Sequence, residues 1–269
     1  MYWIYQIPAW LVCVLIVGLM VSVAIGGHAL WRRLLGWECT AESNALALGM
    51  LAVVAMMLSL LLAFSSVSVW EAYSSAEEAA ATEASVSGEL VRDLSVYGGP
   101  KANAAREAVR SYIESVISDD WPAMARGGYS EIASHKFNAI FHAAAQLEPR
   151  TPREEVMLRE VWTKANLMNE SRRARIAAAL GSAIPGALWG TLLAGIMLNF
   201  ILFYLLPYNC VNELMLGMYA AMLGLMVFFI IIMDRPYAGT VSVSPYQMES
   251  ALKSMSRWDG EAVSAAARK

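Results

Sequence analysis

The sequence predicts an all-α, polytopic membrane protein with four transmembrane helices in two pairs and a helical soluble domain between them. The chain of 269 residues is 58% hydrophobic and only 16% charged, whereas a soluble domain usually carries about 25% charged residues. The charges are also segregated. Four stretches without Asp, Glu, Lys or Arg, each long enough for a spanning helix of about 20 residues, cover residues 1–30, 44–70, 176–212 and 214–233.

These stretches place the membrane spans in chain order. The spans are expected over residues 9–27, 45–70, 185–206 and 213–233. The first lacks a basic segment before it and exceeds a signal-peptide core in length, so we expect it to be retained. The predicted parts are a first transmembrane pair (1–70), a soluble domain (71–180), a second transmembrane pair (181–234) and a tail (235–269).

The soluble domain is expected to contain helices only. Because no Gly or Pro occurs between Gly49 and Gly88, the second span should continue as one helix to about Tyr97, where Gly98-Gly99-Pro100 breaks it. Further helices are expected over residues 101–117, 130–147 and 152–180, the last with a capping box formed by Thr151 and Glu154. In the tail, residues 241–245 are expected to be extended and residues 246–256 to form a surface helix.

Basic residues near the spans give the predicted orientation. Arginines at 172, 173, 175 and 235 outnumber those at 32 and 33, which favours cytoplasmic termini and a cytoplasmic soluble domain, in a bacterial inner membrane. Arg172, Arg173 and Arg175 are interpreted as a membrane anchor that contacts lipid headgroups; drawing anions to a pore is the alternative. Cys39 and Cys210 then share the external side, where they either form a disulfide or remain two thiols.

The order of several short motifs resembles the bestrophin-like bacterial membrane proteins. These motifs are Ala63-Phe64-Ser65, Glu83-Ala84, Pro100, Tyr112, Ile184-Pro185 with Trp189, and Asp234-Arg235-Pro236-Tyr237-Ala238-Gly239. The resemblance covers nearly the whole chain. Bestrophins are pentameric anion channels with a hydrophobic neck on the second membrane helix, so the resemblance implies a homo-oligomer that conducts inorganic ions. The sequence has no acidic run like the Ca²⁺ clasp of animal bestrophins, and calcium gating is not expected.

One face of the long second helix is a candidate pore lining. At about 100° per residue, the residues on this face are apolar in the membrane and acidic beyond it. They form a predicted neck of Met57, Leu60, Phe64 and Val67 and a predicted acidic vestibule of Glu71, Glu78 and Glu89. Apolar constrictions gate by dewetting and acidic rings favour cations, so this face suggests a cation where the resemblance implies an anion. In the alternative interpretation, the acids form a solvated face and Phe64 packs inside a bundle.

Glu83 lies on a different, small and apolar face of the same helix. A carboxylate buried there needs a partner. The candidate partners are Arg106, Arg110 and the arginines at 172, 173 and 175. Two interpretations stay open: a structural ion pair between helices, and a pH-sensitive gating element.

The sequence argues against several other functions. Net charge is −3 and the pI about 5.7, which does not suggest a nucleic-acid partner. His135 and His142 lack a third ligand nearby and the three cysteines lack metal-ligand spacing, so no metal or cofactor is expected. No catalytic motif is present, and the protein is not expected to be an enzyme. The alternative to a channel is a non-conducting scaffold or sensor whose soluble helices bind a partner.

Overall fold

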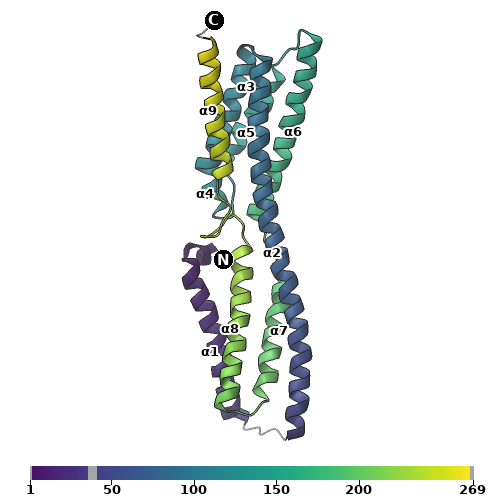
Figure 1. Cartoon of the computed structure of the whole chain (residues 1–269), viewed down its shortest axis with the longest axis vertical. Helices are drawn as coiled ribbons and strands as arrows, with labels where there is room; N and C mark the ends of the chain where they lie inside the picture. The colour runs from purple at the N-terminus through teal and green to yellow at the C-terminus, as the bar shows by residue number, and fades with distance from the viewer. Residues whose placement is uncertain (1, 36–40, 267–269) are drawn as a thin grey trace. The chain divides into compact units, whose positions relative to one another are not determined.

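The computed structural model describes residues 2–35 and 41–266, and all regular structure in these ranges is helical (Figure 1). The elements are a 3₁₀ helix η1 (Tyr2–Gln6), α1 (Ala9–Leu35), α2 (Ala41–Tyr97), α3 (Gly99–Ser115), a π-helical turn η2 (Val116–Asp120), α4 (Trp121–Met124), α5 (Glu131–Ala145), α6 (Pro152–Leu180), α7 (Gly186–Tyr204), α8 (Cys210–Met233) and α9 (Tyr246–Ala266). Within the described ranges, four helices are long and apolar enough to cross a membrane: α1, α2, α7 and α8. The predicted all-α membrane fold is confirmed.

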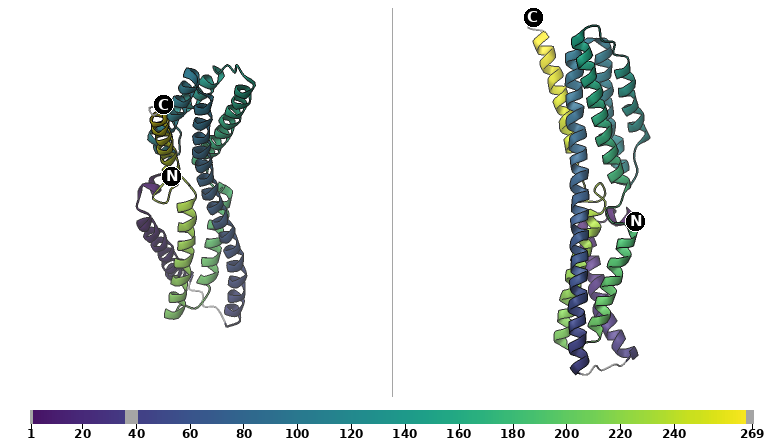
Figure 2. Two further views of the ribbon diagram at one scale, coloured as in Figure 1. Left: turned by 45° about the horizontal axis from the view of Figure 1, so that its top comes forward. Right: turned by 90° about the vertical axis from the view of Figure 1, so that its right-hand side faces the viewer.

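The chain divides into two compact units, and α2 contributes to both. The membrane unit contains Met1–Tyr73, Ser182–Arg235 and Gly239–Val241. The soluble unit contains Ser74–Gly181, Pro236–Ala238 and Ser242–Lys269. Figure 2 gives two further views of the helices in each unit.

In the membrane unit, α1 packs along α8 and also contacts α7. Gly224 permits the close approach of α8 to α1, because a Cβ atom there would lie 3.0 Å from the Cα atom of Val17. Buried polar groups bond between the spans: the Tyr219 hydroxyl donates to Asn199 Oδ1 at 3.0 Å, which joins α8 to α7. Asn199 therefore has the structural role that polar groups usually have inside a helix bundle.

In the soluble unit, local sequence signals determine where helices begin and end. Gly98 and Gly99 both adopt positive φ angles, of 75° and 87°, which glycine reaches without strain and which separate α2 from α3. At the start of α6, the Thr151 hydroxyl accepts the Glu154 backbone N–H at 3.2 Å. The Glu154 carboxylate accepts the N–H of Arg150, one residue before the position expected in a capping box.

Two soluble elements differ from the sequence-based expectation. The helix expected to end at about residue 117 is followed without a break by η2 and α4, which continue to Met124. Pro122 has no N–H to continue the α-helical bonding pattern, and the wider π turn lies directly before it. The tail helix α9 extends to Ala266, ten residues beyond the expected end at 256.

Candidate functional site

The predicted neck residues lie on an exposed face of α2 in the membrane unit. Met57, Leu60, Phe64 and Val67 are all more than half exposed, and Phe64 is 64% exposed. The opposite face packs into the core of this unit through Leu58, Leu62, Ser65 and Val69, all buried. The helix is therefore two-sided: one face is covered by the chain itself, and the other is open to lipid or to another subunit.

Small residues lie beside this open face. Ala52, Ser59 and Ala63 are exposed and fall about 100–140° from Phe64 around the helix on ideal geometry. Small side chains in membrane helices allow a neighbouring helix to approach closely. The open half of α2 thus combines a bulky apolar stripe with an adjacent surface suited to close helix packing.

The three predicted vestibule acids have different environments. Glu71 and Glu78 are exposed on α2. Glu89 is half-buried and forms an ion pair with Lys164 of α6, which also lies 3.6 Å from Glu160. The Glu89 carboxylate raises the pKa of Lys164 by hydrogen bonding to it. The charge of Glu89 is therefore balanced within the chain, whereas Glu71 and Glu78 are exposed.

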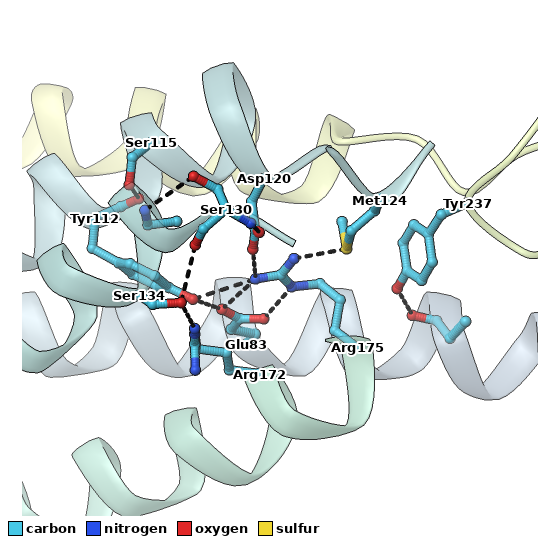
Figure 3. Close-up of polar contacts among 12 residues, drawn as sticks. Glu83, Tyr112, Ser115, Asp120, Met124, Ser130, Ser134, Arg172, Arg175 and Tyr237 are labelled. Carbon is cyan, nitrogen blue, oxygen red and sulfur yellow. Dashed lines mark hydrogen bonds and ion pairs between the residues drawn. The ribbon is translucent and has the colours of Figure 1, made fainter. Parts of the chain in front are cut away.

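A buried polar cluster surrounds Glu83 in the soluble unit (Figure 3). Arg175 Nε donates to Glu83 Oε2 at 2.7 Å, and Arg175 Nη2 lies 2.9 Å from Asp120 Oδ2. The Tyr112 hydroxyl donates to the other Glu83 oxygen, and Arg175 Nη1 points at the sulfur of Met124 at 3.1 Å. Glu83, Asp120 and Arg175 are all fully buried. One guanidinium thus joins α2, η2, α3 and α4 to α6.

The cluster holds two carboxylates for one guanidinium. Burial alone would lower the pKa of Arg175, but Glu83, Tyr112 and Asp120 outweigh it and raise this pKa well above its usual value. Burial, and then the Glu83 charge, raises the pKa of Tyr112. The phenol therefore stays protonated and donates. Asp120 is further held by the backbone N–H of Ser130 at 2.7 Å.

The three clustered arginines of α6 have different environments, and the burial of Arg175 contradicts the prediction that this residue is a membrane anchor. Arg175 is fully buried and cannot contact lipid headgroups. Arg172 is half-buried, donates to Ser134 Oγ at 2.7 Å and lies over the ring of Phe137. Arg173 is exposed. Successive residues of a helix point in different directions, so sequence neighbours need not share an environment.

The segment after α8 is held in the soluble unit by aromatic contacts. The Tyr237 hydroxyl donates to the Ala76 carbonyl at 2.8 Å, and Trp121 Nε1 donates to the Val243 carbonyl at 3.0 Å. The Trp121 and Tyr237 rings meet edge to face with centroids 5.5 Å apart, and the Arg175 guanidinium lies 5.6 Å from the Trp121 ring. Tyr237 of the Asp-Arg-Pro-Tyr motif is therefore a packing residue next to the polar cluster.

Sequence reasoning missed one pair in the membrane unit. His28 Nδ1 lies 2.5 Å from Glu213 Oε1, joining the end of α1 to the start of α8, with His28 stacked on Tyr204. Cys210 is exposed, and its predicted partner Cys39 lies outside the described residues. Across the described residues, no group of three or more His, Cys, Asp or Glu side chains could hold a metal ion.

Comparisons with known proteins agree with this architecture. The Bestrophin-like domain pattern matches residues 18–248. A solved variant of a bacterial bestrophin homologue from Klebsiella pneumoniae is 14% identical, with a TM-score of 0.60 over 92% of this chain and 97% of that chain. Another variant from the same bacterium is 13% identical, with a TM-score of 0.64 over 93% and 98%. No curated protein matches the chain.

At these identities, the likeness to solved structures shows the fold alone. The family pattern goes further, because it extends through the two transmembrane pairs and the soluble helices between them. The resemblance indicated by the order of the motifs is confirmed. This chain is an integral membrane protein that belongs to the bestrophin-like family.

Proposed function

We propose that the protein is a subunit of a homo-oligomeric ion channel, a pentamer by family resemblance, whose neck is formed by α2. One observation carries the proposal: the apolar face of α2 that includes Phe64 is open in the single chain. In a ring of subunits, copies of this face around the axis would form an apolar constriction that opens and closes by dewetting.

The surroundings of this face support an axial position for α2. Its opposite side is buried against the rest of the membrane unit, so the chain already shields one side of the helix. The small residues Ala52, Ser59 and Ala63 beside the stripe would let copies of α2 approach closely. Lipid exposure alone would not need small residues next to bulky ones.

A flux measurement tests the neck. Liposomes containing the wild-type protein should pass ions, and Phe64→Ala should change the rate several-fold because it widens the apolar constriction. Leu19→Ala is the matched control, since Leu19 of α1 is also apolar and 63% exposed but lies outside the proposed pore. A stable monomer without flux would contradict the channel, and silent liposomes with a stoichiometric bound protein would support the scaffold or sensor alternative.

Ion selectivity is tested separately, because the anion expected from the resemblance and the cation expected from the acidic face disagree. We expect Glu71→Gln with Glu78→Gln to shift the reversal potential in a salt gradient towards anion selectivity. Glu107→Gln is the control, since Glu107 is an exposed acid on α3 outside this face. An unchanged reversal potential would contradict the proposed acidic vestibule without contradicting the proposed neck.

Orientation is proposed with the termini and the soluble unit cytoplasmic, in a bacterial inner membrane. Cys210 is exposed at the start of α8, which this orientation places outside. A membrane-impermeant maleimide should label Cys210 in intact cells of a Cys39→Ser variant. In the wild type, labelling that appears only after reduction would indicate the proposed disulfide. Labelling of the Cys39→Ser variant only in broken cells would indicate the opposite orientation, with Cys210 on the cytoplasmic side.

A further inference from the structure

The membrane unit contains a cavity of about 610 Å³ at the ends of α7 and α8. This volume is within the range of about 300–1,000 Å³ that is typical of small-molecule sites. Leu193, Val227 and Ile231 form an apolar wall from the two helices, and Ile4 and Tyr5 of η1 complete it. None of these residues belongs to the proposed neck.

The cavity has a polar end where both helices meet their connecting segments. Asp234 accepts the Ser182 hydroxyl at 2.7 Å and the Ile184 backbone N–H at 3.0 Å. Arg235 forms a longer ion pair with Asp234, with Nε 3.9 Å from Oδ2, and its side chain is a quarter exposed.

This arrangement matches the chemistry of a membrane lipid. The apolar wall lies on two membrane-spanning helices, and the polar end follows the last residue of α8. Trp189 also lines the cavity. Tryptophan side chains are enriched at membrane–water interfaces. An arginine presents several N–H donors that bind phosphate oxygens.

We propose that the cavity binds a glycerophospholipid, with one acyl chain between α7 and α8 and the phosphate on Arg235. The acyl chain covers mainly Leu193, which is 52% exposed, and Ile231, whereas Val227 is already buried and adds little exposed area to the cavity wall. The site is separate from the α2 face, so it holds whether or not the protein conducts ions.

The test uses the full-length protein in nanodiscs containing phosphatidylglycerol with a photoreactive acyl chain. Crosslinked peptides should map to α7 and α8 around Leu193 and Val227. Leu193→Trp, which fills the cavity, should lower this labelling several-fold. Met197→Trp is the matched control: both residues are 52% exposed on α7, but Met197 lies one turn further and does not line the cavity.

A second variant that fills the cavity controls for misfolding of Leu193→Trp. A Cβ atom at Gly186 would meet nothing within 4 Å, and Gly186 lines the cavity, so Gly186→Leu should fold and also reduce labelling. Equal labelling of wild type, Leu193→Trp and Gly186→Leu would overturn the site. A cysteine crosslink between subunits through position 193 would also overturn it, because a second copy would then be the occupant.

The phosphate contact has its own measurement. Diacylglycerol with the same photoreactive chain lacks the phosphate and should label wild type several-fold less than phosphatidylglycerol. Arg235→Gln should remove this preference and leave diacylglycerol labelling unchanged. Retention of the full preference in Arg235→Gln would overturn the assignment of the phosphate to Arg235.

Discussion

Replacing Arg175 should destabilise the protein far more than replacing Glu83, although the two side chains are paired. Arg175 faces two buried carboxylates, so Arg175→Met leaves both Glu83 and Asp120 without their cation. Removing one partner of a single buried ion pair costs about 3–5 kcal/mol. With two carboxylates affected, we expect the cost to lie at or above the upper end of this range.

Glu83→Gln is expected to be much milder. Arg175 keeps Asp120 at 2.9 Å, so a one-to-one ion pair remains, and the amide oxygen still accepts the Tyr112 hydroxyl. The variant weakens a charge-assisted hydrogen bond without leaving an unpaired charge, at a cost of about 1–2 kcal/mol. A difference of about 3 kcal/mol between the variants corresponds to about a hundredfold in the unfolding equilibrium.

Thermal unfolding of the purified protein in detergent measures this difference. At about 2–4 °C per kcal/mol, Arg175→Met should lower the midpoint by more than about 10 °C and Glu83→Gln by only a few degrees. Arg173→Met is the control, because Arg173 is exposed on the same helix. Adding Glu83→Gln and Asp120→Asn to Arg175→Met should restore part of the loss. Equal losses for the two single variants would refute the assignment of two carboxylates to one guanidinium.

Three further predictions concern stability. Burial, and then neighbouring carboxylates, raise the pKa of Asp93 above its ordinary 3.8, so the loss of stability from ionising Asp93 begins at about pH 3.8 and is complete above the folded pKa. Asp93→Asn should therefore raise the unfolding midpoint at neutral pH but not below about pH 3.8; an equal gain at both would contradict this. The raised pKa of Tyr112 gives stability that is complete below about pH 10 and declines above it. Tyr112→Phe should flatten that alkaline decline, and an unchanged slope would exclude this phenol. Gly224→Ala should lower the midpoint by several degrees because its Cβ atom would meet the α1 backbone at 3.0 Å, whereas Gly217→Ala, with an ordinary 3.5 Å contact, should not; similar midpoints for the two would contradict close packing at Gly224.

The membrane spans were predictable because their signal is local. A charge-free run of about 20 residues has few stable alternatives to a spanning helix, and each predicted span overlaps a helix in the structure. Helix breaks at Gly98 and Gly99 follow equally local rules. α9 continues past the predicted end at residue 256 because neither proline nor glycine interrupts the sequence there.

The contacts of the polar cluster were not predictable in the same way. The small apolar surroundings of Glu83 indicated that it needs a partner, and Arg175 was one of five candidate arginines. Arg175 is 92 residues away, and no local pattern selects it from the other four. Asp120 is absent from the predicted site residues, since two adjacent acids shortly before Pro122 give no sign that one of them is buried. The His28 and Glu213 pair had a usable signal: each is a lone ionisable group at one end of an apolar span, and the two ends lie on the same predicted side.

The disagreement between anion and cation selectivity is smaller in the structure than in the sequence. Lys164 balances the charge of Glu89. Arg92 adds a further positive charge nearby, because Arg92 and Glu89 line one pocket of the soluble unit. Lys164 and Arg92 offset part of the negative charge of Glu89, Asp93 and Glu160. The acidity that would favour cations is therefore concentrated at Glu71 and Glu78. An apolar neck adds a dehydration barrier without preferring either sign. We therefore expect ion preference in the proposed channel to depend mainly on these two carboxylates per subunit, and neutralising them is the experiment that decides it.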